Sequence, residues 1–408
     1  MKKYHLFEVF GIELEYMLVE KSDWKVSPIV DQLMRAKTGE IVSDVDNGKI
    51  AWSNELTAHV VELKTNGPTA DLENLDSLFA ENIGEINQLL KSLNAKLWPT
   101  AAHPLMDPKT EMQLWKHHNS EIYALYNRVF DCCGHGWANV QSMHLNLPFY
   151  DDAEFEKLHA AIRLLLPIIS ALSASSPIFE GKNTGFLDAR MEVYKTNQKE
   201  IPEMTGKVIP ERVYSKEAYS REIFEPINAA VKPYDTEHIL DQHFLNSRGA
   251  IARFDRNAIE IRVIDVQECP KADIAIAVLI IEVLKMLVNQ ETVSLENQKF
   301  WHENELFEIF NDVIKNAEHT VITDSEYLKL FGFDGKEATA GELWKHVYEK
   351  TKTRISPKHQ KTLKFLLENG SLASRILKAV NEDFSKENLK NVYDRLGDCL
   401  AKNQLFAP

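Results

Sequence analysis

The chain has 408 residues, of which 44% are hydrophobic and 26% charged, as expected for a soluble globular protein with one large core or two domains. Its net charge of −14, with no run of basic residues, argues against nucleic acid as a partner. An acidic enzyme of anionic substrates must offset its own field locally, with metal ions and a few arginines.

Targeting and membrane signals are missing from the sequence. The N-terminus carries two lysines, but His5 and Glu8 interrupt the apolar core that a signal peptide needs. The longest apolar stretch, residues 274–281, is far shorter than the ~20 residues that span a bilayer. We therefore expect a cytoplasmic protein without membrane contact.

The four cysteines show no CxxC spacing and no disulfide-framework density, which predicts reduced thiols. Cys132 and Cys133 lie beside Gly134 and His135. A thiol–metal site there is the alternative, although no second cysteine pair completes it.

The first 65 residues read mostly as strands. Residues 9–19 alternate between apolar and other side chains, and residues 57–65 alternate less cleanly. In the first strand one side is expected to carry Ile12, Leu14, Tyr16 and Leu18, and the other Gly11, Glu13 and Glu15. Pro68 and Thr69 are then expected to open a helix whose apolar residues recur at helical spacing as far as Leu93.

The middle of the chain continues this mixture. Short strands are predicted over residues 97–101 and 140–147. A second long helix is expected to begin near Asp151 and to kink or end at Pro167. The segment 251–264 contains a third clear strand, and residues 273–287 have the composition of a buried helix.

The last third of the chain reads as helical. Ser356 and Pro357 are an N-cap residue and a first-turn proline, and Gly370 can close that helix. We expect residues 1–290 to form the catalytic region and 291–408 a helical region packed on the same domain. The polar segment 195–232 is either a loop over an active site or a solvated insertion.

The strands are separated by single long helices or loops, without regular βα alternation. This order predicts the α+β class, with an antiparallel sheet in place of a doubly wound fold.

Familiar nucleotide and hydrolase motifs are absent. The Gly-Lys pairs at residues 48, 181, 206 and 335 are followed by Ile, Asn, Val and Glu, where a phosphate-binding loop needs Ser or Thr. Gly134-His135-Gly136 fails the dinucleotide pattern, and no GxSxG or HExxH sequence occurs. Any nucleotide must be bound in another way.

Two pairs of glutamates are candidates for chemistry. Glu13 and Glu15 are two residues apart on a predicted strand and share one face, where two carboxylates repel unless a cation offsets them. Glu55 and Glu62 are seven residues apart, so a loop or bulge before the strand is needed to bring both to one site. Either pair alone is more often a solvated strand face.

A histidine lies on the polar face of the predicted strand at residues 140–147. Ser142, His144 and Asn146 share that face, opposite Met143 and Leu145. A lone histidine in such a place is more often a hydrogen-bonded structural residue than a ligand.

The fourth pattern is the sequence around Glu260. Glu260 and Arg262 share the polar face of their predicted strand, and Arg253 and Arg256 lie just upstream. Alone, this pattern favours a face of cross-strand ion pairs.

Together the four patterns describe three strands that each turn an apolar face to a core and an acidic or histidine face the other way. Mostly oxygen ligands with one imidazole suit Mg²⁺ or Mn²⁺, and the arginines offer fixed charge for phosphate oxygens. The candidate metal ligands are Glu13, Glu15, Glu55, Glu62, His144 and Glu260.

At these residues the sequence resembles the type 2 glutamate–cysteine ligases and the related bacterial carboxylate–amine ligases of the glutamine-synthetase superfamily. The resemblance rests on five segments in the expected order: GIELEY at 11–16, NELTAHVVELKT at 54–65, TAAHP at 100–104, ALSASSPIFEGKNTGFLDAR at 171–190 and EIRVID at 260–265. Some branches of the family have a second histidine where this chain has Ser142, which leaves the subfamily and the substrate open.

The resemblance implies a barrel-like, open cleft walled by an antiparallel sheet and flanked by helices, with ATP entering one end. It implies one metal held by Glu15, Glu55 and Glu62, and another, nearer the phosphates, held by Glu13, His144 and Glu260. Arg262, Arg253 and Arg256 would contact ATP, and Arg190 and Asn146 would lie on the substrate side. Glu260 and Arg262 would be the catalytic pair.

The implied activity is an ATP- and Mg²⁺-dependent ligation that forms an amide through an acyl phosphate. Glutamate and cysteine, giving γ-glutamylcysteine, are the leading substrates. The alternatives are another amino acid or amine in the same chemistry, and a catalytically silent binding protein on the same scaffold. The oligomeric state stays open, with a homodimer as one option.

Overall fold

An eight-stranded antiparallel sheet forms the centre of the protein in a computed structural model that describes residues 2–408, apart from the side chain of His243. The strand order is β2-β3-β4-β1-β6-β10-β9, and β5 also pairs with β1. The strands are β1 Gly11–Glu20, β2 Asp44–Asn47, β3 Ile50–Asn54, β4 Val60–Thr65, β5 Ala95–Trp98, β6 Ser142–Pro148, β9 Ala250–Arg253 and β10 Ala258–Asp265. Within residues 2–408 the end strands β2 and β9 do not pair, so the sheet stays open.

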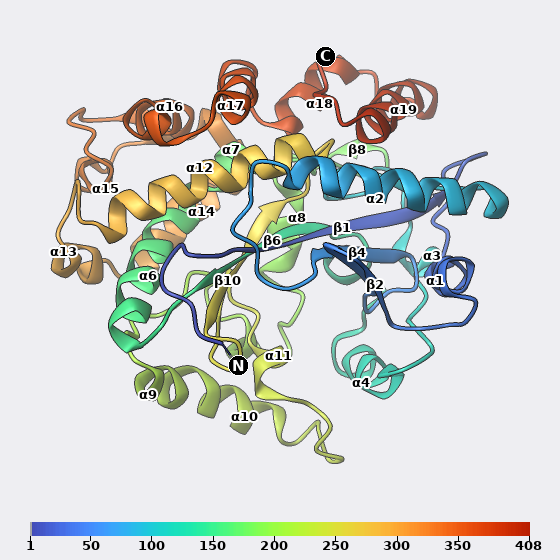
Figure 1. The fold of residues 1–408 in the computed structure, drawn as a ribbon, viewed down its shortest axis with the longest axis horizontal. Helices are drawn as coiled ribbons and strands as arrows, with labels where there is room; N and C mark the ends of the chain where they lie inside the picture. Colours follow the sequence, from blue (N-terminus) through green and yellow to red (C-terminus); the bar gives the residue numbers. More distant parts are fainter. Residues whose placement is uncertain (1) are drawn as a thin grey trace.

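Long helices cover one face of this sheet. Figure 1 shows α2 and α12 on the same side of β1 and β6, and α6 packs against α12. The helices up to α12 are α1 Val30–Thr38, α2 Leu75–Leu90, α3 Pro108–Glu111, α4 Ser120–Phe130, α5 His135–Ala138, α6 Asp152–Leu165, α7 Ser170–Ser173, α8 Ala189–Tyr194, α9 Lys216–Tyr219, α10 Glu225–Val231, α11 Gln242–Leu245 and α12 Pro270–Val288. Four of them, α4, α9, α10 and α11, lie below the sheet in the same view, on its other side.

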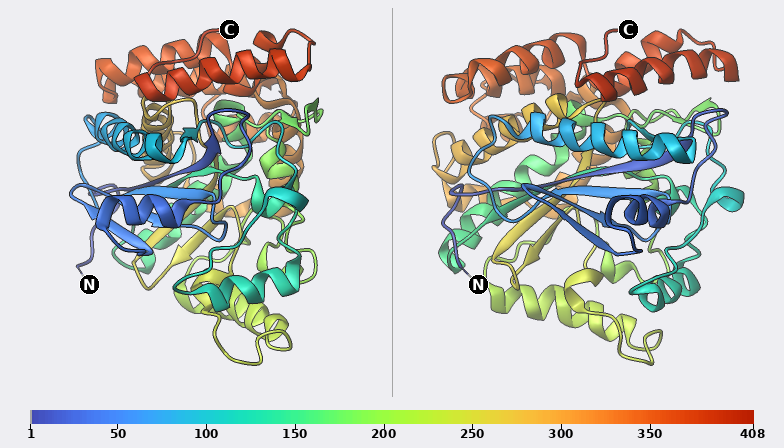
Figure 2. Two further views of the ribbon diagram at one scale, coloured as in Figure 1. Left: turned by 90° about the vertical axis from the view of Figure 1, so that its right-hand side faces the viewer. Right: turned by 45° about the vertical axis from the view of Figure 1, so that its right-hand side comes forward.

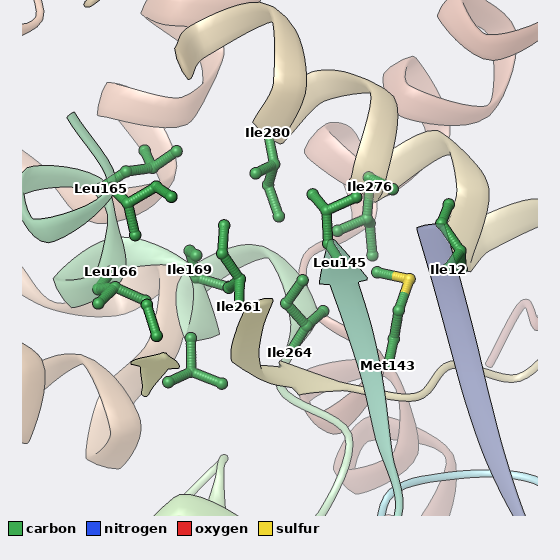
Figure 3. Packing of buried hydrophobic residues seen from close by; sticks show 14 of the residues in the cluster. Ile12, Met143, Leu145, Leu165, Leu166, Ile169, Ile261, Ile264, Ile276 and Ile280 are labelled. Atoms are coloured by element: carbon green, nitrogen blue, oxygen red, sulfur yellow. The ribbon is translucent and has the colours of Figure 1, made fainter. Parts of the chain in front are cut away.

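The core lies between the sheet and these covering helices. Leu145 and Ile261 project from β6 and β10 toward Ile276 and Ile280 of α12 (Figure 3), and all four side chains are buried. The strand residues predicted to be apolar, such as Ile12, belong to the same cluster. Because successive strand residues alternate between faces, this packing turns Glu13 and Glu15 to the other face of the sheet. The α+β, antiparallel prediction is confirmed.

Helices also form most of the C-terminal third, and Figure 2 shows the last of them, drawn in red, stacked above α2. They are α13 Leu295–Phe300, α14 Glu303–Asn316, α15 Ser325–Leu330, α16 Ala340–Thr351, α17 Pro357–Asn369, α18 Leu372–Val380 and α19 Lys386–Lys402. The hairpins β7 Ile178–Phe179 with β8 Lys182–Asn183 and β11 Val321–Ile322 with β12 Ala338–Thr339 are minor additions. No helix within residues 2–408 is long and apolar enough to cross a bilayer.

The caps predicted for the helix after Ser356 are confirmed. The Ser356 side chain accepts a hydrogen bond from the His359 amide, and Gly370 ends α17 with a positive φ of 82°. Phe310 of α14 and Trp344 of α16 belong to the same core cluster as Ile12 of β1. The division of the chain at residue 290 stays a prediction.

Three element boundaries differ clearly from the prediction. The strand expected over residues 97–101 is β5, which begins at Ala95 and ends at Trp98. The helix expected from Pro68 begins at Leu75, because Thr69 instead exchanges backbone hydrogen bonds with Phe10 as an isolated antiparallel bridge. The segment 251–264 is a hairpin of β9 and β10, and Asn257 has the positive φ of 54° that its turn requires. The end of the second long helix is confirmed: α6 stops at Leu165, before a short 3₁₀ turn that contains Pro167.

The segment 195–232 is not a solvated insertion, so that alternative is wrong. Its side chains Ile209, Tyr219 and Ile227 are fully buried in the main core cluster. Most of its second half is helical, in α9, a π-helical turn and α10. A role in closing the cleft stays a prediction.

Candidate active site

The polar face of the sheet gathers the predicted site residues from four strands. The antiparallel registers place them directly opposite one another: Glu13 faces Lys64 on one side and His144 on the other, Glu15 faces Glu62, and Glu260 faces Asn146. Directly opposed residues on an antiparallel pair lie on the same face with adjacent side chains. The fold therefore brings residues almost 250 positions apart in sequence onto one surface.

Glu13, His144 and Glu260 form the tightest group, which we call the His144 half. One ligand atom from each lies within 4.8 Å of the others, a spacing that could hold a metal ion. His144 Nδ1 is 3.0 Å from Glu13 Oε2 and 3.7 Å from Glu260 Oε1. Asn146 Nδ2 donates to the other Glu13 oxygen at 3.1 Å, so Asn146 orients this carboxylate.

Protein cations balance the charge of the His144 half. Burial by itself would raise the pKa of Glu13, but the hydrogen bond and charge of His144, with Lys64 and Arg262, lower it to about 2. Burial and the charge of Arg262 oppose protonation of His144, yet hydrogen bonding to Glu13 and nearby carboxylates leave its pKa raised. The Arg262 guanidinium donates to Glu260 Oε1 at 2.5 Å.

Glu15, Glu55 and Glu62 form the second group, the Glu62 half. Glu62 Oε1 accepts from Ser53 Oγ at 2.8 Å and from Lys64 Nζ at 2.9 Å. Burial, followed by the charge of Glu13, raises the pKa of Glu62 to about 7. Burial, followed by the charges of Glu62 and Glu15, raises the pKa of Glu55 well above its usual range.

The Glu62 half is less tightly gathered than its partner. Among residues 2–408, the ligand atoms of Glu13, His144 and Glu260 all lie within 4.8 Å of one another, whereas those of the Glu62 half lie farther apart. Glu15 Oε2 is held by the backbone amide and hydroxyl of Ser142, at 2.7 and 2.9 Å. Like charges repel, and Glu15 is paired with the Ser142 donors while Glu62 is paired with Ser53 and Lys64.

The two halves are joined through Ser142. Its hydroxyl lies 2.9 Å from His144 Nε2 as well as 2.9 Å from Glu15 Oε2. Glu55, by contrast, reaches the site from the connection between β3 and β4, as the seven-residue spacing to Glu62 required. These contacts make one continuous polar face of the two predicted metal sites.

The predicted ATP-contacting arginines have three different environments. Arg253 Nη1 lies 3.7 Å from Glu260 Oε2, and its other nitrogens pair with Asp255. Arg262 follows Glu260 in β10, where a register shift between Ile261 and Ile264 marks a bulge. A bulge re-aims the side chains at its position. Arg256 lies in the hairpin turn with about half of its side chain exposed, and its role stays a prediction.

Arg190 is held by the protein itself. It is 2% exposed, its Nε donates to Asp265 Oδ1 at 2.5 Å, and its terminal nitrogens lie 3.4 Å from the Arg262 carbonyl. The second Asp265 oxygen accepts from the Ser175 amide and the Ser176 hydroxyl. This buried network fixes the end of β10, and contact between Arg190 and a substrate stays a prediction.

Sequence reasoning missed two further residues of this face. Lys64 is two positions after Glu62 on the same strand, and that spacing alone would have placed it among the carboxylates. Tyr123 on α4 has its hydroxyl 3.3 Å from Asn54 Nδ2, and the charge of Glu55 adds to burial in raising its pKa. Only the folded structure brings α4 to this place.

The predicted thiol–metal alternative has no support in the structure. All four cysteines are free, and the group with metal-ligand spacing found among residues 2–408 contains no cysteine. Burial raises the pKa of Cys132 to about 12, which disfavours the thiolate that binds metals.

An open antiparallel sheet that carries buried carboxylates, a histidine and arginines on one face is the architecture of a site for cations and anions together. A profile of glutamate–cysteine ligase family 2 matches residues 9–395, and the chain belongs to this family. A protein of unassigned function from Archaeoglobus fulgidus is 31% identical over 98% of this chain and 100% of its own length.

Named relatives match over a shorter part of the chain. A protein of Cupriavidus metallidurans, provisionally named glutamate–cysteine ligase 2, is 28% identical over 45% of this chain and 46% of its own length. Among solved structures, the glutamate–cysteine ligase of Francisella tularensis in complex with AMP is similar with a TM-score of 0.65. That match has 13% identity and covers 98% of this chain and 90% of the other, so it supports the fold.

Proposed function

We propose that the protein is an ATP-dependent ligase that joins a carboxylate to an amine through an acyl phosphate. The observation that carries this proposal is the group of Glu13, His144 and Glu260, held within 4.8 Å and flanked by Arg253 and Arg262, in a chain of a ligase family. Carboxylates with one imidazole fit Mg²⁺, with Mn²⁺ as the alternative. A divalent cation bound there supplies positive charge for the phosphate oxygens.

The reaction has two steps. An oxygen of the substrate carboxylate attacks the γ-phosphorus of ATP, the bond to the bridging oxygen breaks, and ADP leaves. The amine nitrogen then attacks the acyl carbon, the bond to the phosphate oxygen breaks, and the amide forms with release of phosphate and a proton. Phosphorylation is needed because an ionised carboxylate is a poor acyl donor.

The protein supplies position and charge in this scheme. Arg262 and Arg253 offer planar guanidinium groups to phosphate oxygens, beside the carboxylate of Glu260 that keeps them in place. Asn146 orients Glu13, and Ser142 orients Glu15. Transfer of a phosphoryl group depends mainly on such positioning and on neutralised charge.

Glutamate and cysteine, giving γ-glutamylcysteine, are the proposed substrates, supported by the family and by the names of its members. The test is a matrix of carboxylates and amines, each incubated with the protein, ATP and Mg²⁺. ADP release and product mass are measured. We expect cysteine-dependent ADP release with glutamate and a product of the mass of the dipeptide.

Two other outcomes have distinct meanings. ADP release that depends on a different acid or amine keeps the ligase chemistry and replaces the substrates. A matrix with no ADP release in any well would reject the enzyme and leave a binding protein on the same scaffold. Glu62→Gln is the control for contaminating ATPase, because it removes a site carboxylate without changing the size of the side chain.

A further inference from the structure

An exposed aromatic ring lies at the edge of the proposed site. Phe244 belongs to α11, the short helix before β9, and 63% of its surface is exposed. Its backbone carbonyl accepts a hydrogen bond from the Tyr126 hydroxyl of α4 at 3.2 Å. The helix that carries the ring is thus tied to α4, the helix that brings Tyr123 to the Glu62 half.

The ring is connected to the acidic face by a single arginine. The Arg253 guanidinium carbon lies 5.1 Å from the centroid of the Phe244 ring, and Arg253 Nη1 lies 3.7 Å from Glu260 Oε2. Arg253 itself is 5% exposed. From the surface inward, the exposed Phe244 ring, the buried Arg253 guanidinium and the buried Glu260 carboxylate therefore follow one another.

We propose that Phe244 is the stacking platform for the adenine base of ATP, an inference that rests on the proposed function. A nucleoside triphosphate has a flat aromatic base at one end and a polyanion at the other, in the same order as the ring and the arginine-flanked carboxylates. One face of the ring meets Arg253, and its large exposed surface leaves room for a base. A base stacks on an aromatic side chain through their π faces.

The contact with Arg253 strengthens the assignment. A guanidinium on the ring is attracted by its π electrons, and the same guanidinium can donate to a phosphate oxygen. The ring therefore helps to fix an arginine that the proposed mechanism uses. Arg253 is also held by Asp255, at 3.1 and 2.9 Å, so loss of the ring is expected to remove mainly the base contact.

The experiment compares Phe244→Ala, Phe244→Trp and Phe300→Ala with the wild type. Phe300 is the matched control, because it is 77% exposed and lines a separate cavity of about 580 Å³ with Tyr214 and Lys299. Affinities for the magnesium complexes of a non-hydrolysable ATP analogue and of tripolyphosphate are measured by calorimetry. Tripolyphosphate carries the polyanion without the base.

We expect Phe244→Ala to weaken binding of the ATP analogue by about tenfold or more, the effect of losing one base–aromatic stack. Tripolyphosphate binding should stay within about twofold, and Phe244→Trp should keep the affinity for the analogue, because indole also offers a π face. Phe300→Ala should match the wild type with both ligands. In the ligation assay the same loss should appear in KM for ATP with kcat little changed.

The results separate this inference from the proposed function. Wild type that binds the analogue, with Phe244→Ala binding it equally well, overturns the platform and keeps the ligase. An equal loss for the analogue and for tripolyphosphate also overturns it, because Phe244 would then act only through Arg253. Wild type that binds no ATP analogue overturns both proposals.

Discussion

The two halves of the acidic face balance their charge in different ways. In the His144 half, His144, Arg262 and Arg253 lie beside the two carboxylates, and the pKa of Glu13 falls to about 2. In the Glu62 half, three carboxylates have Lys64 as a nearby cation, and the pKa of Glu62 rises to about 7. Both halves include a glutamate of β1 and both contact Ser142. The difference between their pKa values therefore comes from the charged side chains around each half.

This difference suggests a division of labour. A carboxylate that is already paired with protein cations has its position fixed before a ligand arrives, which favours accurate positioning of phosphate. Carboxylates with raised pKa values hold protons that a divalent cation would displace, which makes that half dependent on the cation. If the halves are two functional units, substitutions in the two should differ in their effects on activity and on stability.

The largest effect is expected for Glu62→Gln. Gln keeps the size of the side chain and a hydrogen-bonding oxygen, but it removes the negative charge on which the Glu62 half depends for a cation. We expect ligation to fall by at least about a hundredfold, because direct metal ligands matter at least as much as the residues that orient them. ADP release with the active acid and amine is the measurement.

The folded state of Glu62→Gln is checked by its melting temperature with and without Mn²⁺. A surface control is Glu326→Gln, whose pair with Lys329 is largely solvent-exposed and contributes little to stability. If Glu62→Gln and wild type have the same metal-dependent shift in melting temperature, the Glu62 half does not hold the cation.

A somewhat smaller effect is expected at the arginines of the other half. Arg262→Gln should lower kcat/KM for ATP by about a hundredfold, the usual scale for losing one donor to a developing charge. Arg256→Gln should stay within about twofold, because that side chain is half exposed in the hairpin turn. Steady-state kinetics at fixed Mg²⁺ measure both variants. Equal losses in the two would show that the hairpin turn also contacts the nucleotide.

Much of the fold follows from local patterns in the sequence. The alternation of Ile12, Leu14 and Tyr16 with Glu13 and Glu15 gives both the strand and its two faces, and all three apolar side chains are fully buried. The boundaries that failed depend on partners far along the chain. The segment after Pro68 lost its first helical turn to a backbone bridge between Thr69 and Phe10, which no local pattern records.

The candidate site was accessible from the sequence only in part. Glu13, His144 and Glu260 were predicted together through family segments, and the structure places them in one group. Which residue of one strand lies beside which residue of the next depends on the strand register, whereas side-chain alternation gives only the face. Tyr123 and Phe244 lie on helices outside the recognised segments, and their proximity to the site follows from tertiary packing alone.

The smallest expected effect is on the pH dependence of the free energy of unfolding, measured with a chelator present and without substrates. The folded-state pKa of Glu62 is raised from 4.5 to about 7, so the fold favours its protonated form. Its contribution is full below the unfolded pKa and is lost as the pH rises through about 7. The raised pKa of His144 has the same sign, since stability from protonated His144 is lost as the pH rises through its folded pKa.

We therefore expect the chelated wild type to be less stable at pH 8 than at pH 6, with Glu62 accounting for about 1 kcal/mol of the difference. Urea unfolding at the two pH values measures it. Glu62→Gln should show a difference smaller by that amount, because Gln does not titrate, whereas Glu326→Gln should follow the wild type. Adding Mn²⁺ should reduce the loss at pH 8, because a cation stabilises the ionised carboxylate. Glu62→Gln and the wild type could instead lose the same stability between pH 6 and pH 8. The Glu62 carboxylate of the wild type would then be ionised across this range, and both halves would be balanced by protein cations alone.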